Sequence, residues 1–226
     1  LFFSYFDYHK LYIFSFPLML ATIILLILVL VPGIGTASGG ARRWIDLGII
    51  NFQPTELAKF SVIIYLSSWF VVKERKRFFS FITLLGLLVF LIILQPDMGT
   101  AIIVFSLSVI IYFLAGVQVA HMIAFIPLAV LGFIFLIKIS PYRFQRITAF
   151  LNPTSDLLGV GYHINQILIS LSNGGLLGQG FGASRQKYLF LPEAHTDSIF
   201  AIIAEEFGFM GAFLLIFAFF VLIYKI

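Results

Sequence analysis

The chain has 226 residues, of which 61% are hydrophobic and 11% are charged, and its mean hydropathy is +1.09. This much apolar surface cannot be buried inside one water-soluble core, so the composition predicts an all-α integral membrane protein whose helices satisfy their own backbone hydrogen bonds in lipid. The net charge of +4 comes without a basic and aromatic array, which excludes nucleic-acid binding, and the absence of cysteine excludes disulfides and cysteine metal sites.

Six apolar segments are predicted to cross the membrane, because a spanning helix needs about 20 apolar residues and shorter runs are tolerated where helices are buried. They cover about residues 11–31, 54–72, 78–94, 99–114, 120–137 and 199–223. Pro32-Gly33 ends the first segment and Gln95-Pro96 ends the third. The chain lacks an initiator methionine and stops just after the sixth segment, so we expect a fragment of a larger bundle.

The loops between these segments predict the orientation. Residues 73–77 carry four bases and one acid in a very short loop, which places that loop in the cytoplasm. The loops with Arg43, with Asp97 and with residues 140–198 are then extracytoplasmic. These loops also contain Arg and Lys, so either the topology is inverted or the cations are kept for a negatively charged ligand.

The long loop of residues 140–198 is predicted to have structure of its own, because it exceeds an ordinary connection. Ile164, Ile167 and Leu171 recur with helical spacing from Gly161 onward, which predicts an amphipathic helix at the membrane interface, buried through these side chains. Gln166 lies between them and is a candidate substrate-binding residue. Beyond this helix the loop becomes strongly charged.

Charged side chains gather where this loop enters the sixth apolar segment. Asp197 lies two residues before Ile199, at the predicted boundary between water and lipid. The candidate binding residues near it in the sequence are Arg185, Lys187, Glu193 and His195. A helix-capping carboxylate explains Asp197 alone, but its charged neighbours favour a site. His195 lacks the spacing of a metal ligand set, and no G-x-S-x-G or P-loop pattern is present.

Two earlier pairs of polar residues are further candidates. Glu56 and Lys59 lie three residues apart within the second segment, where they form either a local ion pair or part of a site. Arg43 and Trp44 suit an interfacial anchor or a phosphate contact. Asp97 is expected to cap the fourth segment, and Glu205 with Glu206 to form hydrogen bonds between helices.

Four motifs in one order resemble the SEDS family of membrane glycosyltransferases, whose members are FtsW, RodA and SpoVE. The motifs are ARRWIDLG at 41–48, QPTELAK at 53–59, QPDMGTA at 95–101 and LPEAHTDSIFAIIAEE at 191–206. The segment SRQKYLFLPE is more similar to the FtsW and SpoVE branch. Ser198 and Asn51 depart from the residues that many members carry.

The resemblance implies a ten-span fold with two spans before Leu1 and two after Ile226. It implies a peptidoglycan glycosyltransferase of the bacterial cytoplasmic membrane, which polymerises lipid II on the outer side. The implied partners are a class B penicillin-binding transpeptidase and other divisome or elongasome membrane proteins. No cofactor is evident, and a divalent cation stays open.

For this chemistry the pyrophosphate is already a good leaving group and needs cations, while the attacking hydroxyl needs a base. Asp197 is the expected base, and we expect Lys59 to face the same cavity. A lipid II flippase and a non-catalytic scaffold for a transpeptidase are the alternative functions.

Overall fold

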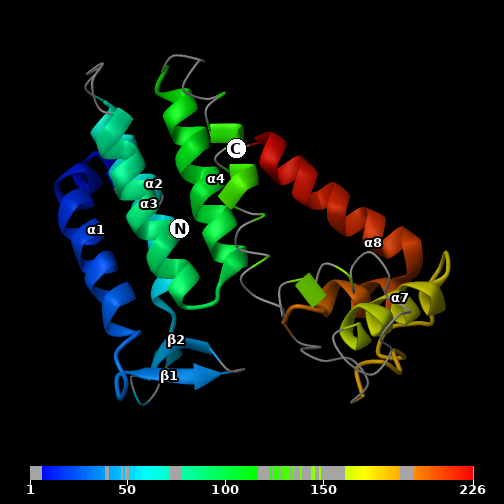
Figure 1. The fold of residues 1–226 in the computed structure, drawn as a ribbon. Helices are drawn as coiled ribbons and strands as arrows, with labels where there is room; N and C mark the ends of the chain where they lie inside the picture. The colour runs from blue at the N-terminus through cyan, green and yellow to red at the C-terminus, as the bar shows by residue number, and fades with distance from the viewer. Residues whose placement is uncertain are drawn as a thin grey trace. The chain divides into compact units, whose positions relative to one another are not determined.

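The computed structural model describes residues 7–38, 41–46, 48, 51–71, 78–116, 161–188 and 196–225, with isolated positions between 123 and 148. The described residues are mostly helical (Figure 1), as the composition predicts. The chain divides into two compact units, Leu1–Leu128 and Ala129–Ile226, and each is described by itself.

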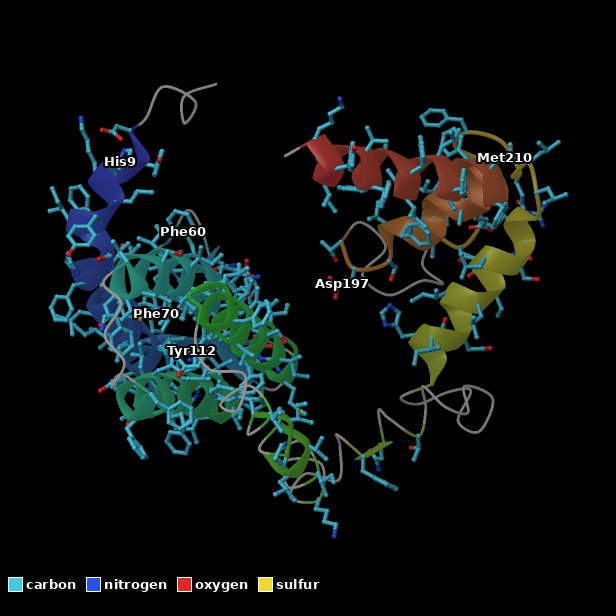
Figure 2. All side chains as sticks on the ribbon, turned by 90° about the horizontal axis from the view of Figure 1, so that it is seen from above. His9, Phe60, Phe70, Tyr112, Asp197 and Met210 are labelled. Carbon is cyan, nitrogen blue, oxygen red and sulfur yellow. The ribbon has the colours of Figure 1, made fainter. Side chains whose placement is uncertain are left out.

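The first unit is built from packed helices. They are the 3-10 helix η2 (Tyr8–Lys10), α1 (Leu11–Leu28), α2 (Pro54–Phe70), α3 (Phe78–Leu94) and α4 (Met98–Leu114). Helix α2 packs against α1 and α4, and α3 packs against α4. Phe81 and Tyr112 stack at the centre of an aromatic cluster that includes Phe70 (labelled in Figure 2). The bundle therefore has a continuous apolar core.

Helix boundaries in this unit follow local chemistry. Pro54 occupies the first turn of α2, where its missing N–H costs nothing. The carboxylate of Asp97 accepts a hydrogen bond from the Thr100 backbone N–H at 3.1 Å and so caps α4. The predicted cap is confirmed.

A small antiparallel sheet corrects the predicted all-α class. It consists of β1 (Gly35–Ser38), β2 (Ala41–Asp46) and β3 (Asn51–Phe52), in the order β1-β2-β3. Figure 1 shows β1 and β2 at one end of the helices of this unit. Strands of four, six and two residues are too short to give a clear alternation in the sequence. The sheet positions Arg43 and Trp44 on β2.

The second unit contains α7 (Tyr162–Gly174) and α8 (Ile199–Lys225), which pack against each other. Helix α7 confirms the amphipathic helix predicted from Gly161, and it continues to Gly174. Its Ile167 packs against Ala201 and Ile202, whereas Leu171 is 38% exposed. Of the three predicted side chains, Ile167 therefore contributes to the contact between the two helices, and the interfacial location of the helix stays a prediction.

Helix α8 is interrupted at Gly208, whose φ of 68° and ψ of −168° are not helical. The bend is visible between the orange and red parts of α8 in Figure 1. The predicted span of residues 199–223 therefore consists of two helical segments. Such a break leaves backbone N–H and C=O groups without their helical partners.

The loop after α7 supplies those partners. Gln179 N–H and Gly180 N–H donate to the carbonyls of Glu205 and Glu206, both at 3.0 Å. In the opposite direction, Phe209 N–H donates to Gly175 O at 2.9 Å, and Met210 N–H donates to Leu176 O at 3.2 Å. Residues 175–180 thus bridge the break with four backbone hydrogen bonds.

Two helical segments in the described residues are long and apolar enough to cross a membrane, Tyr8–Leu28 and Ile199–Lys225. Helices α3 and α4 are apolar but shorter, with 17 residues each. The predicted loop of residues 73–77 and half of the residues of the predicted fifth span lie outside the described residues.

Candidate functional site

Arg43 lies on β2 and is bound to the turn between α3 and α4. Its Nε donates to Gln95 O at 2.9 Å, and its Nη2 donates to Pro96 O at 2.6 Å. Gln95 is itself fully buried and donates through Nε2 to Leu26 O at 3.2 Å. These bonds use two of the five N–H donors of the guanidinium, so Arg43 connects the sheet to the helices and retains donors for an anion.

Two Gln-Pro motifs meet at this end of the unit. Gln53 Nε2 donates to Asp97 Oδ2 at 3.4 Å, and Thr100 Oγ1 donates to the same oxygen at 2.8 Å. The N-terminal turns of α2 and α4 are therefore linked through one carboxylate. This arrangement gives Asp97 a structural role, as its sequence context predicts.

Glu56 and Lys59 form the local ion pair that their spacing predicts. Lys59 Nζ lies 2.7 Å from Glu56 Oε1, and the two side chains are 29% and 59% exposed. Both groups lie on the first turns of α2, near the sheet. The ion pair is therefore at the same end of the unit as Arg43. A substrate-binding role for Glu56, Lys59, Arg43 and Trp44 stays a prediction.

Asp197 lies in the turn that precedes α8, and its side chain is exposed. Figure 2 shows it ahead of the orange first segment of α8. The next residue, Ser198, is 2% exposed, and its carbonyl accepts from Ala201 N–H at 3.0 Å in the first turn of the helix. The carboxylate therefore lies next in the chain to a buried serine at the start of the helix, and just outside the helix itself.

His163 is a neighbour of this turn that the sequence analysis missed. Its Nε2 lies 2.7 Å from Ser198 Oγ, and the two side chains share a hydrogen bond between α7 and the start of α8. A helical spacing pattern could have indicated it, because His163, Ile167, Ser170 and Gly174 lie on one stripe of α7 and the last two are buried. The stripe predicted from the sequence shares Ile167 with this one but does not include His163.

The predicted cations of the charged loop have different surroundings. Lys187 Nζ donates to Glu206 Oε1 at 2.8 Å and to Gly182 O at 2.7 Å. The hydrogen bond that Lys187 donates to the Glu206 carboxylate raises the pKa of Lys187 above its ordinary value. Arg185, by contrast, is exposed. Lys187 therefore fastens the loop to α8, and Arg185 is the freer cation for a phosphate.

Glu205 and Glu206 bind this loop rather than another helix, which corrects their predicted role. Ser184 Oγ donates to Glu205 Oε2, and Ser184 N–H donates to Glu206 Oε1 at 3.4 Å. Both glutamates are buried, at 0% and 7% exposure. Their partners come from residues 182–188, so the side chains reinforce the backbone bridge at Gly208.

Gln166, Glu193 and His195 are the remaining candidate residues. Gln166 is half-buried on α7, and Glu193 and His195 lie outside the described residues. Among the described residues, no three of His, Asp and Glu gather in a way that could hold a metal ion, and we assign no metal site. The expected meeting of Lys59 with Asp197 joins the two units and stays a prediction.

Comparison with known proteins gives consistent matches over the whole chain. The model of the FtsW, RodA and SpoVE family, described as cell cycle protein, matches residues 1–226. A probable peptidoglycan glycosyltransferase FtsW of Coxiella burnetii is 44% identical over 92% of this chain, and stage V sporulation protein E of Bacillus subtilis is 41% identical over the same share. The chain spans 58% of the length of each of these relatives.

Solved structures match as well. A chain from a peptidoglycan synthase complex, in a study of polymerization and crosslinking, aligns with a TM-score of 0.71 at 26% identity and covers 99% of this chain and 63% of its own length. The rod shape determining protein RodA of Thermus thermophilus aligns with a TM-score of 0.62 at 26% identity, covering 99% of this chain and 58% of its own. With a family model that matches from end to end, the chain belongs to the FtsW, RodA and SpoVE family of membrane proteins, the SEDS family.

Proposed function

We propose that the protein polymerises peptidoglycan by transferring sugar from lipid II to a glycan hydroxyl, with Asp197 as the general base. The observation that carries the proposal is an exposed carboxylate in the turn ahead of an apolar helix of membrane length. Support comes from relatives named as probable peptidoglycan glycosyltransferases, which are 40–44% identical to this chain.

In the proposed reaction, the acceptor hydroxyl attacks the anomeric carbon of the lipid-linked sugar. The new C–O bond forms as the bond to the pyrophosphate breaks, and the pyrophosphate leaves with the electron pair. The proton of the hydroxyl passes to Asp197, while cations balance the charge on the phosphates. A single carboxylate is sufficient because the leaving group needs no proton.

We assign charge balance to Arg43, Lys59 and Arg185. Arg43 retains N–H donors beside its two carbonyl partners, and Lys59 is paired with a glutamate that is 59% exposed. Arg185 is exposed in the loop that Lys187 fastens to α8. In the proposed whole protein, Lys59 and Asp197 face one cavity.

The proposed setting is the bacterial cytoplasmic membrane, crossed ten times by the whole protein, with the site on its outer side. The proposed partner is a class B penicillin-binding transpeptidase, supported by the likeness to a chain from a peptidoglycan synthase complex. Other membrane proteins of division or elongation would bind the same assembly. We propose the FtsW and SpoVE branch, in line with the relatives named above.

The test is Asp197→Asn in the full-length protein, purified with its transpeptidase partner and supplied with lipid II. Removing the base should lower glycan synthesis by at least about 100-fold, the usual contribution of general base catalysis. Asp7→Asn is the matched control, because Asp7 is an exposed carboxylate outside the proposed site that accepts from His9.

Synthesis that persists in Asp197→Asn at the level of the control would contradict the assignment. If synthesis persists while movement of lipid II across vesicles stops, the flippase function takes its place. If neither activity is present in the wild type, a scaffold for the transpeptidase is the remaining function.

A further inference from the structure

We propose that His163 and Ser198 form a positioning pair that fixes the orientation of Asp197. The proposal rests on the proposed function, and it adds a role for two residues to which the proposed function gives none. It starts from the 2.7 Å hydrogen bond between His163 Nε2 and Ser198 Oγ, which joins α7 to the residue next to the carboxylate.

The position of Ser198 explains how this bond can restrict Asp197. Asp197 precedes α8, so the helix does not fix its backbone, and an exposed side chain at such a place samples several rotamers. Ser198 is 2% exposed and connected directly to Asp197 through one peptide plane. A bond that holds Ser198 therefore also limits the dihedral angles that aim the carboxylate.

The far end of the bond is firmly placed. His163 lies one helical turn before Ile167, which packs against Ala201 and Ile202 of α8. Further along the same stripe, Gly174 approaches the Ala204 carbonyl so closely that a β-carbon at this position would collide with it. Helix α7 is thus held against α8 at both Ile167 and Gly174. His163 therefore offers Ser198 a hydrogen-bond partner with a fixed position.

Positioning matters because a general base must lie within hydrogen-bond reach of the proton that it removes. A displacement of about 1 Å can lower the rate by as much as 100-fold without changing the chemistry. Loss of the His163–Ser198 bond should therefore lower kcat and leave KM nearly unchanged, because neither residue is among the proposed substrate-binding residues. A role in folding alone would instead change the yield and stability of the protein without changing kcat of the folded fraction.

The test is a double-mutant cycle with His163→Leu and Ser198→Ala, measured as glycan synthesis from lipid II by the full-length protein with its transpeptidase. Each single variant should lower kcat by about three- to tenfold, which is the effect of losing one part-buried hydrogen bond. The double variant should be no slower than the slower single variant, because both changes break the same bond. His163→Gln retains a side-chain amide at a similar reach and should restore kcat to within about twofold of the wild type.

Two matched controls separate the bond from general damage to the helix pair. Ser170→Ala removes the hydroxyl of a different buried serine, which lies on α7 and donates to Gln166 O in the same helix at 3.1 Å. Asn165→Leu replaces a half-buried polar residue on the opposite side of α7 from His163. Both controls should keep kcat. Amide hydrogen exchange of residues 196–202 should become faster in the Ser198 variant and stay unchanged in the controls.

The outcomes that overturn the proposal are distinct. If Asp197→Asn abolishes synthesis while the two pair variants keep wild-type kcat, the proposed function stands and the positioning pair is wrong. Additive losses in the cycle, or a loss confined to KM, also contradict it. If Asp197→Asn is fully active, the proposed function is wrong, and the positioning pair loses its basis with it. Should His163→Leu not fold, Ser198→Ala and His163→Gln alone still decide between these results.

Discussion

Arg43 shows at the scale of a single residue how a charged group can be both structural and available. Its guanidinium donates to Gln95 O and Pro96 O, which belong to the turn between α3 and α4. Lysine could not repeat this contact, since an ammonium on a flexible stem does not present two donors in a fixed plane.

We expect Arg43→Lys to lower the free energy of unfolding by about 1–2 kcal/mol, because one of two hydrogen bonds to backbone carbonyls is lost and the other weakens. The measurement is thermal or denaturant unfolding of the purified protein in detergent. Arg42→Lys is the control, as its side chain is the exposed neighbour on β2. Equal stability of the two variants would show that the contacts of Arg43 contribute nothing.

At the scale of an element, the form of α8 depends on another segment of the chain. Gly208 adopts a positive φ, and a β-carbon there would collide with Gly178 N and Leu176 O. Gly178 is equally constrained, because a β-carbon there would meet Glu206 O. Two glycines therefore allow the loop and the broken helix to touch backbone to backbone.

Gly208→Ala should lower the free energy of unfolding by about 1–3 kcal/mol or more. Alanine is strained at this φ, and its β-carbon would push residues 175–180 away from α8. Gly86→Ala is the matched control. Gly86 is exposed within α3, with nothing within 4 Å of an added β-carbon, so alanine should stabilise the helix by about 0.5–1 kcal/mol. Thermal unfolding of both variants checks the difference in sign, and stabilisation by both would mean that α8 is continuous.

Much of the helical framework was readable from the sequence, because long apolar runs end at strong breakers. Helix α3 begins and ends where predicted, at Phe78 and Leu94, since Gln95-Pro96 follows it. The break at Gly208 was not readable, because a glycine inside an apolar run is compatible with a helix and its cause lies in residues 175–180. The His163–Ser198 bond was missed for the same reason, since it joins residues 35 positions apart.

The candidate site was predictable to a similar degree. Local pairs were correct where both partners lie within one turn, as with Glu56 and Lys59. Lys187 was expected near phosphate, yet Glu206, which is 19 positions further along the chain, binds it. Sequence proximity identifies charged segments well, but long-range partners decide which charge stays available.

At the scale of the whole molecule, orientation in the membrane is the remaining prediction. The dense basic cluster of residues 73–77 predicts a cytoplasmic location for that loop and an external location for the loop of residues 140–198. Single cysteines introduced at positions 75 and 156 are clean probes, because the chain has no cysteine of its own. In intact cells, an impermeant thiol reagent should label position 156 and not position 75. The reverse pattern would invert the topology and remove the proposed site from the outer side.

The bridge at Gly208 also bears on how the chain is made. Translation proceeds from the N-terminus, so residues 175–180 leave the ribosome before residues 209–225. The carbonyl and N–H groups of residues 175–180, which form hydrogen bonds with the backbone on either side of Gly208, are therefore already synthesised when the second half of α8 emerges. If residues 175–180 followed α8 in the chain, four backbone groups at the break would have no hydrogen-bond partner until those residues were synthesised. In lipid, each such group would cost several kcal/mol. The order of the segments along the chain thus provides the partners of the break before the second half of α8 is synthesised.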